Sequence, residues 1–257
     1  MDLRKNFGRQ HAQHRRAAGF TQQGMAEVMG YAVKTVQAME QGLRTPTIDY
    51  ATRADSVLGL DGVLRNLAEL CQEDSSPFGS FLEHEQRATL IRTYAPILVH
   101  GLVQTEAYAR AVMEATAEQP DIDDGLRTRM ARQAILDRPD PPRLHVILDE
   151  SVLWRVVGND EVLHEQLARL GDLPPSVTVQ VLPRTSGAHP GVDGSLTILE
   201  FEDETPVINV SGWRHSAIID APAEVKTARE SFERLAALAL PPDLSAEMIE
   251  YAMENPG

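Results

Sequence analysis

Four side chains occupy positions where acid–base chemistry or metal binding could occur. Asp149 and Glu150 end a run of branched residues, and His189 and Asp193 lie in the segment Gly-Ala-His-Pro-Gly-Val-Asp-Gly. A carboxylate at a strand end beside a loop histidine can transfer protons or hold a cation. No metal-ligand spacing, nucleophile elbow or phosphate-binding glycine motif accompanies them, and a loop that positions a hairpin explains the same residues. The sequence therefore predicts a protein that is not an enzyme and has no metal or other cofactor.

A stronger pattern lies between Phe20 and Gly42, where two short helices are predicted on either side of a tight turn. Thr21 is a suitable N-cap for the first helix, and Gly30 can end it. Gly42 can end the second helix in the same way. The apolar residues repeat at helical spacing, as Met25, Ala26 and Met29 and then as Val33, Val36 and Met39. This arrangement is typical of a helix-turn-helix, whose second helix lies in the DNA major groove.

Over about residues 7–70 the chain resembles the Cro/repressor-type helix-turn-helix, the xenobiotic-response-element family. The resemblance is carried by Thr21-Gln22, Ala26-Glu27, Gly30, Thr35, Glu40-Gln41-Gly42 and Pro46. It implies two sets of DNA contacts. Residues at the base-reading positions are Val33, Lys34 and Gln37, and residues at the phosphate-holding positions are Thr21, Gln22 and Arg44. The family usually has Ser or Thr where this chain has Ala32.

The same resemblance implies a structural ion pair between Arg15 and Glu40, which would tie the first helix to the recognition helix. It also places leucines where this chain has His11 and His14. Two interpretations of these histidines remain open. Both rings could pack at the helix edge as neutral imidazoles, or they could make the helix responsive to pH.

The charge of the chain is divided unevenly along its length. Residues 1–70 hold nine Lys or Arg and seven Asp or Glu, whereas residues 71–257 hold 15 and 31. Because affinity for nucleic acid comes largely from neutralised phosphates, only the first part is suited to DNA. The single cysteine, Cys71, excludes an intramolecular disulfide framework. Without a signal peptide or a long apolar run, the sequence predicts a soluble, cytoplasmic protein.

The pattern of elements predicts an α+β multidomain fold. Residues 1–72 form an all-α helix-turn-helix domain of five helices, and a polar segment at 73–79 links it to an α/β domain at 80–257 with a small mixed sheet. Runs at 144–150 and 177–183, separated by a helix near 160–170, predict a parallel βαβ unit. The predicted elements that complete this domain are an extended piece before Pro96, helices at Leu82–Leu90, from about Thr105, and at 125–137, Pro222–Leu238 and Leu244–Met253, and a hairpin of 195–201 with 206–212.

Residues 80–250 resemble a C-terminal domain of unknown function that follows a Cro-type helix-turn-helix in many actinobacterial regulators. The similar segments include RTYAPILVHGLVQTEAYARA, LHVILDE, VTVQVLP, GAHPGVDGSLTILEF and PVINVSG. The resemblance implies a small partner protein encoded nearby and a role described as antitoxin-like. Aromatic and apolar residues that flank the strands are the expected anchors of a protein interface, namely Tyr94, Leu98, Tyr108, Trp154 and Trp213.

Taken together, the sequence predicts a sequence-specific, DNA-binding transcriptional regulator that reads the major groove through the helix at about 32–41. We expect it to bind double-stranded DNA at an inverted repeat as a homodimer, with the C-terminal domain mediating dimerisation or partner binding. The alternative is an antitoxin-like interaction module that neutralises a small partner and binds DNA weakly.

Overall fold

The structure is a computed structural model of the 257-residue chain, and it describes residues 3–73, 77–116, 122–212 and 215–255. The chain divides into two compact units. The first comprises residues 1–88 and 198–229, and the second comprises residues 89–197 and 230–257. The first unit thus combines the N-terminal helices with a segment from much later in the chain.

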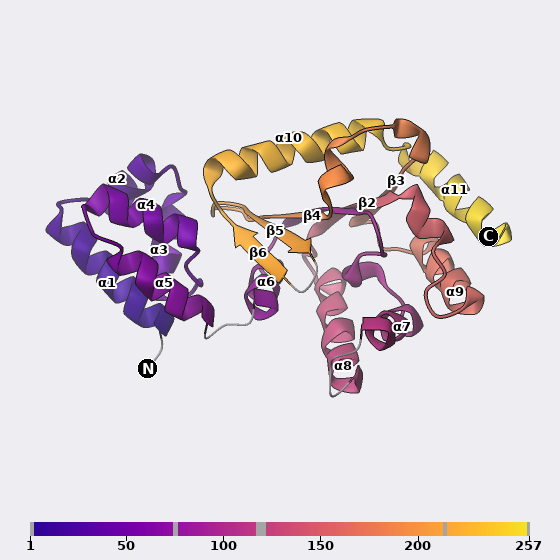
Figure 1. The fold of residues 1–257 in the computed structure, drawn as a ribbon, viewed down its shortest axis with the longest axis horizontal. Helices are drawn as coiled ribbons and strands as arrows, with labels where there is room; N and C mark the ends of the chain where they lie inside the picture. Colours follow the sequence, from indigo (N-terminus) through magenta and orange to yellow (C-terminus); the bar gives the residue numbers. More distant parts are fainter. Residues whose placement is uncertain (1–2, 74–76, 117–121, 213–214, 256–257) are drawn as a thin grey trace. The chain divides into compact units, whose positions relative to one another are not determined.

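Five helices form the N-terminal bundle (Figure 1). They are α1 (Leu3–Ala17), α2 (Gln22–Met29), α3 (Val33–Gln41), α4 (Ile48–Leu58) and α5 (Val63–Glu73). The Thr21 hydroxyl accepts a hydrogen bond from the Gly24 amide, and Thr47 caps α4 through the Tyr50 amide. Gly30 ends α2 in the left-handed conformation, with φ of 76°. The buried core of the bundle includes Phe7, Met25, Met29, Val36, Met39, Tyr50 and Leu64.

The later part of the chain contributes a six-stranded mixed sheet, with strand order β3-β2-β1-β4-β5-β6 (Figure 1). The strands are β1 (Leu90–Ala95), β2 (Arg143–Asp149), β3 (Val177–Leu182), β4 (Leu196–Glu200), β5 (Val207–Gly212) and β6 (His215–Ile219). The strand pair β1 and β2 is parallel, as is the pair β2 and β3, with Leu90 opposite Arg143 and Leu144 opposite Val177. Strands β5 and β6 are antiparallel.

Helices surround these strands, which confirms the predicted combination of an N-terminal helical domain with an α/β region. They are α6 (Pro77–Glu85), α7 (Glu106–Thr116), α8 (Ile122–Gln133), α9 (Asp160–Gly171), α10 (Pro222–Leu238) and α11 (Pro242–Glu254). Helix α9 connects the parallel strands β2 and β3, as the βαβ pattern predicted. Short 3-10 turns join several elements, among them Glu150–Trp154 after β2.

The extended piece predicted before Pro96 is β1, a strand inside the sheet. Two features differ from the sequence prediction. Helix α6 begins at Pro77, within the segment that was predicted to be a linker, and ends at Glu85 and not near Leu90. Strand β6 was not predicted at all. The residues at its start, His215 and Ser216, lack the alternation of apolar and polar residues that marks a strand. Backbone pairing with the neighbouring strand β5 holds this segment in the strand conformation.

Candidate nucleic-acid interface

The exposed part of α3 presents the residues that the sequence places at base-reading positions. Lys34 is exposed, while Val33 and Gln37 are partly exposed. Val33 and Gln37 are four residues apart and so share one face of the helix. The opposite face of α3 is buried in the bundle through Val36 and Met39. The helix therefore offers a narrow, mostly neutral exposed surface with one lysine.

Two of the three residues expected near the phosphates lie at the start of α2, Thr21 as its N-cap and Gln22 as its first residue. Thr21 is exposed, but its hydroxyl already caps α2. Gln22 donates from its amide nitrogen to a Glu40 carboxylate oxygen at 2.7 Å. Because this bond holds the Gln22 side chain against α3, it fixes the spacing of the two motif helices.

Arg15 and Glu40 form a close, two-point ion pair in the structure. The Arg15 Nε lies 2.6 Å from one carboxylate oxygen, and Nη2 lies 2.9 Å from the other. Both side chains are almost completely buried. Burial opposes ionisation of Glu40, but hydrogen bonds from His11, Arg15 and Gln22 outweigh it and lower its pKa to about 2. The pair thereby ties α1 to the C-terminal end of the recognition helix.

His11 belongs to the same buried cluster. Its Nδ1 lies 3.1 Å from a Glu40 carboxylate oxygen, and its Nε2 lies 3.3 Å from the Tyr50 hydroxyl. The ring thus fills a leucine-like core position while keeping polar partners on both nitrogens. His14 is only partly buried, so the two histidines occupy different environments and only His11 lies in the core.

Arg44 does not lie where the family resemblance implied. Its side chain is 1 % exposed inside the first unit, and its Nη2 lies 3.6 Å from a carboxylate oxygen of Asp220. Its Nη1 donates to the Thr205 carbonyl at 3.4 Å. In this conformation the guanidinium is covered and cannot reach a phosphate group. No residue near Arg44 in the sequence indicated this, because its partners Thr205 and Asp220 lie far later in the chain.

The N-terminal end of α3 is also covered, in this case by Thr205. The Ala32 amide donates to the Thr205 hydroxyl at 2.9 Å, and the Thr205 amide donates to the Thr35 hydroxyl at 2.8 Å. Ala32 has no capping side chain of its own, so Thr205 satisfies an amide that would otherwise lack a partner. Asp220 accepts hydrogen bonds from Tyr31 and from Thr47 at the start of α4. Thr205 and Asp220 are thus site residues that the sequence analysis missed.

The predicted interface anchors fall into different environments. Tyr94 and Tyr108 are buried, so the expectation that they anchor an exposed interface is not supported by their positions. The Tyr94 hydroxyl donates to Asp149, and the Tyr108 hydroxyl accepts from the Val99 amide. Leu98 and Trp154 are partly exposed, while Trp213 lies outside the described residues.

The candidate acid–base residues lie in structural contacts. One Asp149 oxygen accepts from the Ser151 amide at 3.0 Å, and Glu150 accepts from the Arg184 amide at 2.8 Å. The His189 ring caps the turn that contains Asp193 and packs edge-on against Tyr94. Among the described residues, no group of three or more His, Cys, Asp or Glu side chains could hold a metal ion.

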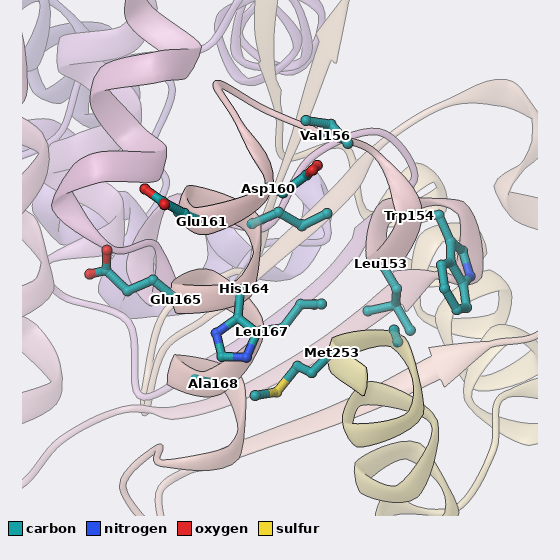
Figure 2. A pocket seen from close by; sticks show the side chains of 12 residues that line it. Leu153, Trp154, Val156, Asp160, Glu161, His164, Glu165, Leu167, Ala168 and Met253 are labelled. Atoms are coloured by element: carbon teal, nitrogen blue, oxygen red, sulfur yellow. The ribbon is translucent and has the colours of Figure 1, made fainter. Parts of the chain in front are cut away.

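A second candidate site is an apolar hollow of about 560 Å³ between α9 and α11. Figure 2 shows Leu167 of α9, Met253 of α11 and Leu153 around it, with Trp154 at one side. The carboxylates of Glu161 and Glu165 point away from its centre. A neighbouring hollow of about 630 Å³ shares Leu167, Ala168 and Met253, so the two form one groove along the helix pair.

The turn geometry and the packing of α2 against α3 define a helix-turn-helix, and residues 6–68 match the family of helix-turn-helix domains. Residues 78–251 match the domain of unknown function DUF5753, and because this match covers more than half of the chain, the protein belongs to the DUF5753 family. No curated protein and no solved structure matches the chain significantly. Within the described residues, no helix is both long enough and apolar enough to span a membrane.

Proposed function

We propose that the protein is a sequence-specific transcriptional regulator of the Cro/repressor type that reads the major groove through α3. The observation that carries this proposal is the exposed Lys34 and the partly exposed Val33 and Gln37 on a helix held by the Arg15–Glu40 pair. A rigid helix with a few exposed side chains is what base readout requires. The protein acts by binding and not by catalysis.

The regulator binds an inverted repeat as a homodimer. A single helix-turn-helix contacts only a short half-site, and two half-sites spaced by about one helical turn give the specificity that one lacks. The acidic composition of residues 71–257 favours contacts with protein over contacts with phosphate. Dimerisation is therefore assigned to the region that follows the bundle.

Selection of bound fragments from genomic DNA by the full-length protein tests this function. We expect enrichment of one inverted repeat. On that sequence, Lys34→Ala and Gln37→Ala should each lose about 1–3 kcal/mol of discrimination at one or two base positions. Arg65→Ala removes a positive charge from the exposed face of α5 and serves as the control. No enriched sequence, or equal losses for all three variants on operator and random DNA, would contradict the proposal.

We also propose that the groove between α9 and α11 binds a basic, amphipathic helical segment of a partner protein. Helix α9 carries Asp160, Glu161 and Glu165 with a single arginine, and α11 carries four acidic residues and no Lys or Arg. An apolar groove between two acidic helices is complementary to a helix with an apolar face and basic flanks. A second copy of this chain, bound through the same groove, would place acidic residues against acidic residues. This binding would support the antitoxin-like alternative, in which a small partner is captured.

Fluorescence of Trp154 offers a direct measurement of groove binding. The chain has two tryptophans, so a Trp213→Phe background leaves Trp154 as the single reporter beside Tyr251, whose ring lies 6.2 Å away. Titration with a model helical peptide of Leu and Lys should shift the emission wavelength of Trp154. This shift should saturate with peptide concentration and weaken at high salt. Met253→Glu should weaken binding about tenfold or more, which corresponds to 1.4 kcal/mol or more. A peptide of equal charge with Ala for Leu is the control, and an equal shift with that peptide would contradict an apolar groove.

A further inference from the structure

The first unit contains an acidic segment that lies on the surface expected to face DNA. Glu202, Asp203 and Glu204 lie one residue after the end of β4 and directly before Thr205, which bonds to the start of α3. The positive end of a helix dipole and free backbone amides make a helix N-terminus a natural site for anions. In a complex of this motif with DNA, the start of the recognition helix is the part that approaches the bases.

Arg44 provides a second, independent contact between this segment and the DNA-binding bundle. Besides Asp220, it has Glu204 as an acidic neighbour, with Nη1 lying 3.6 Å from a Glu204 oxygen. The guanidinium also lies over the ring of Phe201. Glu204 pairs in addition with Arg87 of the same unit. The carboxylates of Asp220 and Glu204 thus stand beside an arginine that the family resemblance assigns to phosphate.

The hydrogen bonding between Arg44 and the carboxylates of Asp220 and Glu204 is incomplete. Within the described part of the chain, Nε and Nη2 of Arg44, Oδ2 of Asp220 and Oε2 of Glu204 are buried without a hydrogen-bond partner. Burial lowers the pKa of Arg44 and raises that of Asp220, although each group favours the charged form of the other. Charges buried with incomplete hydrogen bonding gain little over their solvated state. Water and phosphate can therefore compete for these groups.

We infer that residues 201–205, together with Asp220, are an internal competitor of DNA: they occupy the start of α3 and the Arg44 side chain, and they must move away before the operator binds. This inference rests on the proposed function, because it concerns regulation of the same DNA site. In the closed conformation, which is the one seen in this structure, Thr205 covers the start of α3 and Asp220 neutralises the charge of Arg44. The open conformation frees one amide and one guanidinium for the phosphate backbone. Any ligand that favours release raises the affinity for DNA.

Replacing Asp220 tests the competition in the full-length protein. Asp220→Ala removes the acceptor of Tyr31 and Thr47 and the carboxylate beside Arg44. We expect this variant to bind operator and random DNA about tenfold more tightly. A smaller fraction of the protein is then in the closed conformation, which does not bind DNA. Freed Arg44 should also steepen the salt dependence by about one unit. Asp243→Ala removes an equal charge at an exposed position of α11 and should change neither quantity.

Amide exchange of the unaltered protein gives a test that does not depend on folding of a variant. The Thr205 amide donates to Thr35 in the closed state, so binding of the selected operator should accelerate its exchange while the amides of α3 become slower. Slower exchange at both places would show that the contact persists on DNA and would overturn the inference. Equal DNA affinity of Asp220→Ala and the unaltered protein would overturn it as well. Failure of both proteins to bind any DNA would instead refute the proposed function.

Discussion

Replacement of Glu40 by Gln is expected to lower the free energy of unfolding of the N-terminal helices by about 3 kcal/mol at neutral pH. The carboxylate accepts two hydrogen bonds from Arg15 and one from Gln22, and its side chain is almost completely buried. Gln cannot accept both arginine bonds, so the substitution leaves the Arg15 charge buried without its partner. The loss should appear in α1 and α3 together, because the pair joins these helices.

The loss should depend on pH in a defined direction. The pKa of Glu40 falls from an ordinary value of 4.5 to about 2 in the folded protein. A lowered pKa means that the stabilisation is complete above pH 4.5 and disappears as the pH falls towards 2. The difference between the unaltered protein and Glu40→Gln should therefore be constant at neutral pH and shrink across this interval.

Native-state hydrogen exchange of the α1 and α3 amides measures this local stability. Glu27→Gln makes the same chemical change at an exposed position of α2 and should alter stability by less than about 0.5 kcal/mol. If Glu40→Gln exchanged no faster than this control, the buried pair would contribute nothing to the bundle. A difference that stayed unchanged down to pH 2 would show that the carboxylate is not the group responsible.

The helix-turn-helix could be predicted closely because its signals are local. Thr21 and Thr47 act as N-caps, and Gly30 and Gly42 end helices in the left-handed conformation, as their positions in the sequence indicated. Each of these signals depends on residues within one turn of the helix terminus. The parallel βαβ unit was predictable for a similar reason, since branched runs and a helical period alternate in order.

The position of Arg44 could not be predicted because its partners are distant in sequence. Its bond to the Thr205 carbonyl joins residues separated by 161 positions. From the neighbouring residues alone, Arg44 is expected to be an exposed arginine after a helix. An arginine that contacts phosphate has the same local sequence pattern. Tyr94 and Tyr108 show the same difficulty. Residue type alone does not tell whether a tyrosine anchors an exposed interface or forms a hydrogen bond inside the core.

The second large effect is expected at Gly8, where α1 packs closely against the backbone of α3. A Cβ atom at Gly8 would lie 2.5 Å from the carbonyl oxygens of both Met39 and Glu40. These are backbone atoms, so they cannot rotate away as a flexible side chain would. Gly8→Ala must therefore push α1 away from α3, and we expect a loss of about 3 kcal/mol, at the upper end for an overpacked core.

Gly24→Ala is the matched control, because it adds the same methyl group to another helix of the bundle. There the added Cβ would meet only side-chain atoms, the Thr21 oxygen at 3.3 Å and a Phe20 ring carbon at 3.9 Å, and the better helix propensity of alanine should keep the change within about 1 kcal/mol. Exchange of α3 amides measures both variants. Since Gly8 sets how α3 rests on α1, Gly8→Ala should also weaken operator binding, whereas Gly24→Ala should not. Equal stability of the two variants would show that the helices separate without cost, and the close approach at Gly8 would then not be what holds the reading helix in place.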